Sequence, residues 1–168
     1  MNPLSILRQF VKGLTAETTP GQVAAGAALG MLAGLLPKAT LTGQAAIALM
    51  FIFRVNLPLA AVTMFAVMLL NPWLDRITDP LGYALLTWPA MNPLWTALYN
   101  TPFIPWTGFN NTVLAGGLIT GLLLFLPVYF FARKAAVSFG PGIRSAAAGS
   151  RLIGGIRKSW LFDWYFRD

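Results

Sequence analysis

The chain has 168 residues, of which 57% are hydrophobic and 10% are charged, whereas a soluble domain carries about 25% charged residues. Its mean hydropathy is +0.65. Charged side chains are absent from 53 consecutive residues, 80–132, and from two runs of 20 residues, 18–37 and 55–74. This pattern excludes an ordinary soluble domain and predicts an all-α integral membrane protein.

The composition also excludes several kinds of chemistry. The chain has no Cys and no His, which removes disulfides, thiolate metal sites and Ser-His-Asp triads. Five acidic residues are spread over the chain. We therefore expect no catalytic residues, no metal and no cofactor, and a protein that is not an enzyme. The net charge of +7 does not indicate a nucleic-acid partner, because the basic residues flank apolar runs as the positive-inside rule describes.

Residues 1–17 are expected to form an interfacial amphipathic helix. Asn2 and Pro3 supply a favourable N-cap and first helical residue. Apolar residues recur on one face, and Arg8 and Lys12 lie on the other, which suits an anionic membrane surface. Packing of this helix against the membrane domain is the alternative.

Residues 18–138 form the predicted membrane domain, in which a capping residue followed by Pro recurs. These pairs are Thr19-Pro20, Asn71-Pro72, Asp79-Pro80, Asn92-Pro93 and Thr101-Pro102. A membrane helix must satisfy its first N–H groups without water, so the pairs are expected to begin helices. They divide the domain into helices over 20–36, 40–53, 57–70, 72–87, 93–99 and 111–138.

Most of these predicted helices are too short to cross a bilayer, which requires about 20 apolar residues. Only 111–132 provides a full span. The short pair within 20–53 is expected to form a re-entrant hairpin, because broken helices at membrane depth must be buried in protein or line a cavity. Four or five thin, tilted spans are the alternative.

Basic residues predict the orientation. The tail at 139–168 is basic and aromatic, includes a second amphipathic helix, and is expected to be cytoplasmic like the N-terminal helix. Two cytoplasmic termini require an even number of crossings, so 57–70 is expected to cross outward and 111–132 to return. Residues 71–110, rich in Trp and Tyr, would then lie at the outer interface.

Small residues mark the expected helix contacts. Gly26, Gly30 and Gly34 recur every four residues, and Gly117 and Gly121 repeat that spacing in the last predicted helix. Such glycines allow helix backbones to approach closely. We expect both stripes to serve helix packing, with the second as a candidate surface for the first.

Lys38 and Arg54 are the candidate ligand-binding residues, since each ends a short apolar helix. Ionisable groups at membrane depth are costly and usually functional. Gln22, Gln44 and Asn56 add polar groups nearby in sequence. Two cations beside helix N-termini would suit an anion such as a lipid phosphate. Snorkelling of both side chains to the interface is the alternative.

A weak internal repeat relates residues 1–37 to residues 91–127, with ten identities in 37 ungapped positions. The sequence Met-Asn-Pro-Leu stands at both 1–4 and 91–94. Transporter folds often contain such repeats, so a duplicated half is a further hypothesis.

The segments 19–30, 34–37, 54–58, 71–72 and 79–82 together resemble a bacterial inner-membrane domain family of unknown function. The shared pattern is a Pro-x-x-x-Ala-x-Gly-x-Ala-x-Gly helix, a Pro turn, an Arg-x-Asn element and an Asn-Pro, over about residues 19–130. Lys38-Ala39 departs from the family, in which a small residue and Gly are common. The resemblance implies a bacterial inner membrane, and the fusion of some members to glycosyltransferases implies lipid-linked substrates.

Two functional hypotheses follow from these features. The first is a multi-pass inner-membrane protein that binds or translocates an anionic lipid or a lipid-linked substrate, as a subunit of an envelope assembly. The second is a non-catalytic membrane anchor or scaffold, whose glycine stripes and aromatic tail bind a protein partner or a second copy of the chain.

Overall fold

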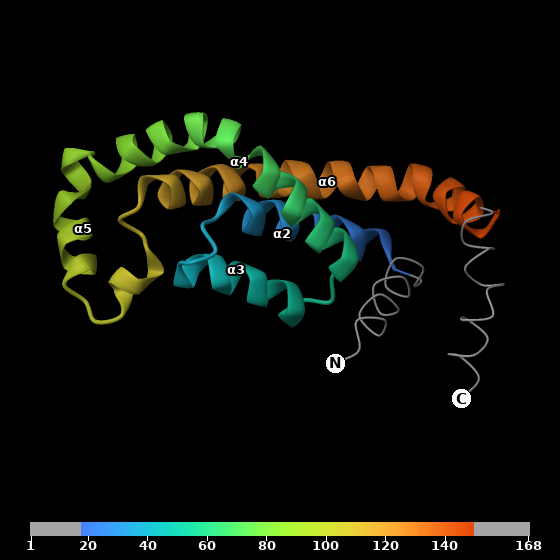
Figure 1. The fold of residues 1–168 in the computed structure, drawn as a ribbon, viewed down its shortest axis with the longest axis horizontal. Coiled ribbons are helices and arrows are strands. Elements are labelled where there is room, and N and C mark those ends of the chain that lie inside the picture. Colours follow the sequence, from blue (N-terminus) through green and yellow to red (C-terminus); the bar gives the residue numbers. More distant parts are fainter. Residues whose placement is uncertain (1–17, 150–168) are drawn as a thin grey trace.

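The computed structural model describes residues 18–149, over which all regular structure is helical. The helices in chain order are α2 (Pro20–Leu35), α3 (Leu41–Ile52), α4 (Leu57–Leu86), the 3-10 helix η1 (Pro89–Met91), α5 (Asn92–Tyr99), the 3-10 helix η2 (Ile104–Thr107) and α6 (Thr112–Gly149) (Figure 1). The all-α prediction is confirmed. The amphipathic helix expected at 1–17 and residues 150–168 of the predicted tail lie outside the described residues. Helix α6 continues through the predicted boundary at 138–139.

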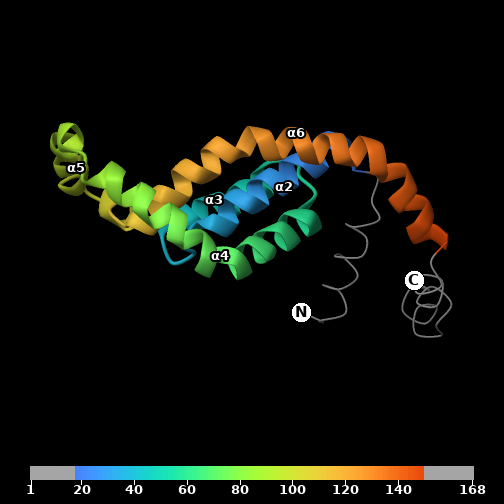
Figure 2. The same ribbon diagram turned by 90° about the horizontal axis from the view of Figure 1, so that it is seen from above.

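Helix α2 lies between α4 and α6 (Figure 2). Its residues from Gly26 to Leu35 are all buried, which the short side chains of Gly and Ala permit. Gly26 faces Asn56 and Gly34 faces Val67, so α2 and α4 run parallel. Helix α6 runs antiparallel to α2, so the two segments of the predicted repeat, 23–37 and 113–127, pack against each other.

Helices α2 and α3 form a hairpin that returns the chain to the end at which α2 begins. Leu36 adopts an extended conformation after α2, and the Thr40 side chain accepts a hydrogen bond from the Gly43 N–H as the N-cap of α3. Gly43 lies directly against the main-chain oxygen of Pro37, so the turn at 37–40 is tight. We call residues 36–40 the hairpin tip.

Helix α4 is one continuous helix of 30 residues with Pro72 and Pro80 inside it, so the predicted division into 57–70 and 72–87 is wrong. Each Pro removes one intrahelical hydrogen bond and kinks the helix without ending it, as is common where neighbouring helices pack around the bend. Figure 2 shows α4 bending along its length. Of the predicted helix starts, Thr19 caps α2 as expected. Asn92 is the first residue of α5 but does not cap it, because the N-cap position is Met91 and has no side-chain cap. Thr101-Pro102 begins no α-helix.

Two helices are long and apolar enough to cross a membrane: α4, and α6 over Thr112–Phe139, which contains the predicted span at 111–132. Only 11% of the most apolar window of α4 is buried, and 28% of that of α6. A helix in the core of a soluble protein would be mostly buried. The exposed apolar faces therefore indicate an all-α membrane protein.

Beyond the hairpin tip, α4 and α6 continue in close contact. Gly82 packs against the main-chain oxygen of Thr112, and Gly116 packs against that of Thr78. Residues 71–86, expected at the outer interface, form the second half of α4. The chain between α4 and α6 holds η1, α5 and η2. Helix α5 lies away from the helix bundle (Figure 1), and η2 returns to α3, where Thr42 Oγ1 donates to the Thr107 oxygen.

Candidate functional site

Asn56 joins the start of α4 to the start of α2, and it is only 7% exposed. Its side-chain oxygen accepts a 2.9 Å hydrogen bond from the Leu59 N–H, which caps α4. Its side-chain nitrogen donates to Thr18 Oγ1 at 3.3 Å, and its main-chain N–H donates to the main-chain oxygen of Gln22 at 3.0 Å. A buried amide with these partners is satisfied, so Asn56 has a structural role.

Gln22 also serves the fold. Thr19 and Gln22 form a capping box, in which the Thr19 N–H donates to Gln22 Oε1 at 2.9 Å and the Gln22 N–H donates to Thr19 Oγ1 at 3.3 Å. This arrangement satisfies two N–H groups that the helix itself leaves unpaired. The first Pro of the family pattern, Pro20, is the first residue of α2.

Arg54 is exposed at the end of α3, two residues before the cap of α4. The starts of α2 and α4 lie at this end of the molecule, and so does the part of α6 around Tyr129, which faces Gly21. Arg133 and Lys134 follow one turn later on α6 and are exposed. We call this end the base face. It holds three cations and no acidic side chain among the described residues.

Lys38 lies at the opposite end of the hairpin and is half-buried. Its Nζ donates a 2.6 Å hydrogen bond to the main-chain oxygen of Gly34, and Asn71 Nδ2 donates to the same oxygen at 3.0 Å. That oxygen is one of the four carbonyls that the end of α2 leaves without an intrahelical donor.

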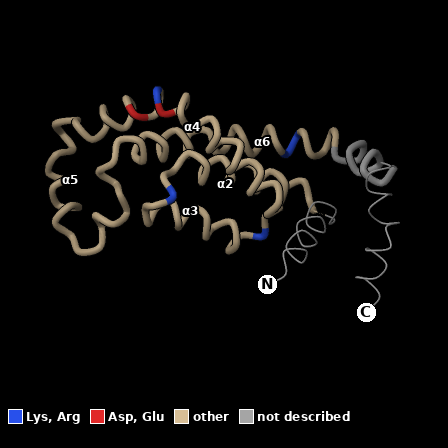
Figure 3. The backbone as a smooth tube through the Cα atoms, in the orientation of Figure 1, with Lys and Arg blue, Asp and Glu red and all other residues tan. Residues whose placement is uncertain are grey.

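The structure does not bring Lys38 and Arg54 together in one anion site. The 12 residues of α3 separate them, a length of about 18 Å at 1.5 Å per residue, and Figure 3 shows the basic positions apart along the backbone. Lys38 donates to the C-terminal end of α2, where a cation is favoured. Gln44 is exposed on α3 and joins neither group.

The two glycine stripes have different partners. Gly26, Gly30 and Gly34 face α4, where an added Cβ would lie 2.7 Å from the Asn56 oxygen at Gly26 and 2.6 Å from Val67 Cβ at Gly34. The α6 stripe also faces α2 but not its glycines. A Cβ at Gly117 would meet the Leu35 oxygen at 3.0 Å, and one at Gly121 would meet Leu32 Cδ1 at 2.5 Å. The expected pairing of stripe with stripe is therefore wrong.

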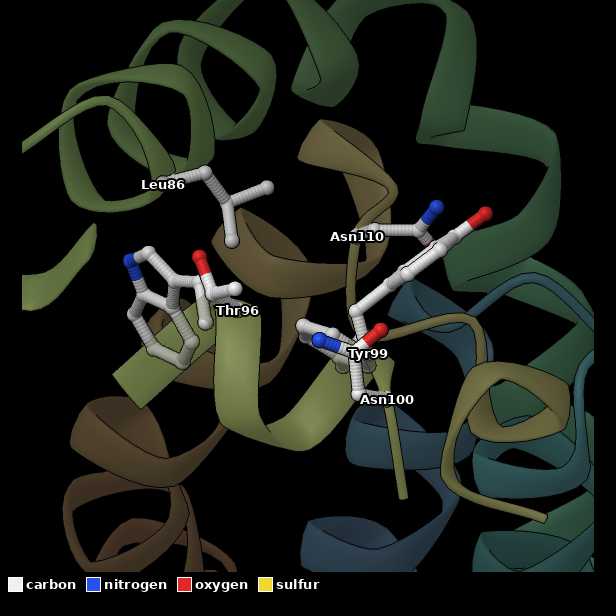
Figure 4. A pocket seen from close by; sticks show the side chains of 7 residues that line it. Leu86, Thr96, Tyr99, Asn100 and Asn110 are labelled. Atoms are coloured by element: carbon white, nitrogen blue, oxygen red, sulfur yellow. The ribbon is translucent and has the colours of Figure 1, made fainter. Parts of the chain in front are cut away.

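The α5 pocket was not predicted from the sequence. It has a volume of about 320 Å³ and is lined by Leu86, Trp95, Thr96, Tyr99, Asn100, Phe109 and Asn110 (Figure 4). These residues come from the end of α4, from α5 and its C-cap, and from the segment before α6. Their Trp and Tyr side chains were assigned only to a membrane interface.

The comparisons with known proteins agree with the resemblance described above. An uncharacterized protein of Treponema pallidum (strain Nichols) is 36% identical over 137 residues, which cover 79% of this chain and 82% of that protein. No solved structure matches the chain. Residues 6–138 match the family described as "Uncharacterized protein conserved in bacteria (DUF2062)", and the chain belongs to this bacterial family.

Proposed function

We propose that the chain is a multi-pass protein of the bacterial inner membrane that binds an anionic lipid headgroup at the base face. The observation that carries this proposal is the position of Arg54, which is exposed between the end of α3 and the capped start of α4. The start of α2 lies on the same face, so the partial positive charges of two helix N-termini add to the guanidinium. A lipid phosphate accepts hydrogen bonds from such donors.

The distribution of charge supports an orientation with the base face in the cytoplasm. Arg54, Arg133 and Lys134 give that face a charge of +3 among the described residues. At and beyond the hairpin tip there are two cations, Lys38 and Arg76, and two acids, Asp75 and Asp79, which sum to zero. The positive-inside rule places the more basic side in the cytoplasm.

The helix lengths support a re-entrant hairpin. The uncharged part of α6, residues 112–132, is about 32 Å long, and the 16 residues of α2 are about 24 Å long. Helix α2 and this part of α6 both start at the base face. The hairpin tip would therefore lie about 8 Å short of the level that Thr112 reaches at the other end. Protein also covers the tip, because Thr42 Oγ1 donates to the Thr107 oxygen at 2.8 Å and Gly108 lies against Thr40.

The test compares two exposed arginines at opposite ends of the molecule. Wild type, Arg54→Gln and Arg76→Gln are extracted from bacterial membranes in polymer nanodiscs, and bound phosphatidylglycerol is measured against bulk lipid. Loss of one charge-assisted interaction weakens binding about tenfold, so Arg54→Gln is expected to lose the enrichment and Arg76→Gln to keep it. Unchanged enrichment in a folded Arg54→Gln protein would contradict the proposal. Protein crosslinks without lipid enrichment would favour the anchor or scaffold.

A further inference from the structure

The α5 pocket contains polar groups that the fold does not use. The side chains of Asn100 and Asn110 are exposed at the pocket and form no hydrogen bond with another side chain or main-chain group in residues 18–139. The neighbouring Asn111 makes the contrast clear, because its Oδ1 accepts a 3.0 Å hydrogen bond from the Leu114 N–H at the start of α6. Asn110 therefore has no part in capping α6, and its exposed amide faces the open side of the pocket.

Trp95 supplies a second, independent observation. Its Nε1 is buried without a hydrogen-bond partner among the described residues. A buried indole N–H without a partner is unfavourable, and buried Trp side chains usually find one. The Trp95 ring stacks on Phe109 with centroids 6.1 Å apart and planes inclined by 30°, which fixes the ring as one wall of the pocket.

The lining defines the chemistry of a suitable ligand. All seven residues lie within the 53-residue stretch that has no charged side chain, so the lining offers a charged ligand no counter-charge. Amides and a hydroxyl offer both donors and acceptors, and Trp, Tyr and Phe offer apolar ring faces. A volume of about 320 Å³ is at the low end of the range for ligand sites, roughly 300–1,000 Å³.

We propose that the α5 pocket binds an uncharged, hydroxyl-bearing ring of the kind found in a sugar head group. The ring's C–H faces would pack on the aromatic side chains, and its hydroxyls would bond to Asn100 and Asn110, which Figure 4 shows beside Tyr99 at the pocket. The ring comes either from a glycolipid or from a free sugar. The pocket lies at the C-terminal end of α4, whereas Arg54 lies next to its N-terminal end. This inference therefore does not depend on lipid binding at the base face.

The test uses the full chain in phosphatidylcholine nanodiscs, prepared without sugar-based detergents because these would occupy the pocket. Equilibrium binding is measured for three probes below their micelle-forming concentrations: octyl glucoside, methyl glucoside and octyl phosphocholine. Wild type is expected to bind octyl glucoside and not octyl phosphocholine. If methyl glucoside also binds, the sugar ring alone is sufficient for binding. If only octyl glucoside binds, the ligand is a sugar linked to a lipid.

Matched variants locate the binding. Asn110→Ala and Tyr99→Ala are expected to weaken octyl glucoside binding about tenfold each. Asn92→Ala and Tyr83→Ala alter the same residue types outside the pocket and are expected to leave binding unchanged. Circular dichroism confirms that each variant remains helical. Equal binding of octyl glucoside and octyl phosphocholine, or equal loss in the pocket and control variants, would overturn the proposal.

Discussion

Asn71 on α4 donates a 3.0 Å hydrogen bond from Nδ2 to the main-chain oxygen of Gly34 on α2. The same oxygen accepts a hydrogen bond from the Lys38 ammonium, so one buried carbonyl at the C-terminal end of α2 has two donors. This contact also explains why Asn71-Pro72 does not begin a helix. Its amide is directed to a neighbouring helix rather than to the N–H groups of its own.

Removal of the Asn71 amide is expected to destabilise the contact between α2 and α4. Asn71→Leu has a similar volume and no donor, and we expect a loss of about 1 kcal/mol in the free energy of unfolding, as for other interhelical hydrogen bonds in membranes. Reversible unfolding in SDS measures the change. An unfolding free energy equal to that of wild type would show that the bond contributes nothing.

Gly30→Ala is expected to separate α2 from α4. Its Cβ would collide with the main-chain oxygen of Ala60, which cannot move without moving α4, and such overpacking costs about 1–3 kcal/mol. Gly21→Ala is the matched control, because its Cβ would lie 3.6 Å from the Tyr129 hydroxyl. The yield of monodisperse protein and the SDS unfolding midpoint should fall for Gly30→Ala only. Equal behaviour of the two variants would count against the close packing.

Two substitutions at Asn56 distinguish the two hydrogen bonds that its side-chain amide forms. Asn56→Ala removes both the cap of α4 and the donor to Thr18, and is expected to cost about 1–2 kcal/mol. Asn56→Asp keeps an acceptor for the Leu59 N–H, loses the donor to Thr18 and adds a negative charge that the N-terminus of α4 favours, so its loss is expected to be smaller. The same SDS titration ranks the two variants. A larger loss for Asp than for Ala would mean that capping is not the main contribution.

Lys38 is expected to act as a helix cap and not as a lipid ligand. Lys38→Met keeps the long apolar stem and removes the donor to Gly34, so we expect a loss of at most about 1 kcal/mol. The phosphatidylglycerol enrichment of Lys38→Met should equal that of wild type, in contrast to Arg54→Gln. A loss of enrichment as large as that of Arg54→Gln would show that Lys38 binds the lipid.

The sequence predicted those features that depend on residues close together in the chain. The start of α2 at Thr19-Pro20 depends on adjacent residues and was predicted correctly, as was the apolar span within α6. The division of α4 failed because a Pro ends a helix only when its surroundings do not support the bend. Whether packing around Pro72 provides that support depends on α2, which is distant in sequence.

The sites show the same limit. Lys38 and Arg54 each follow a short apolar helix in the sequence, and the helix predicted at 40–53 already separates them. Only the structure shows their different surroundings, since Lys38 donates to the Gly34 oxygen and Arg54 is exposed. The α5 pocket depends on the loop that returns the chain to α6, in which Phe103 and Gly108 both have positive φ angles, of 69° and 74°. A positive φ at a Phe is uncommon, and no pattern in the sequence predicts it.

The central claim is that the hairpin enters the membrane and returns to the cytoplasmic side, and single cysteines test it most directly because the chain has no native Cys. Phe53→Cys, Ala39→Cys and Ala90→Cys are placed at the base face, at the tip and in η1, where all three native side chains are exposed.

Labelling with a membrane-impermeant maleimide is compared in right-side-out and inverted vesicles. We expect Ala90→Cys to be labelled from outside and Phe53→Cys from the cytoplasmic side. Ala39→Cys should react at least about tenfold more slowly than either, because its thiol would lie below the hydrocarbon boundary. Labelling of Ala39→Cys from outside as fast as Ala90→Cys would contradict it and would favour thin, fully crossing helices.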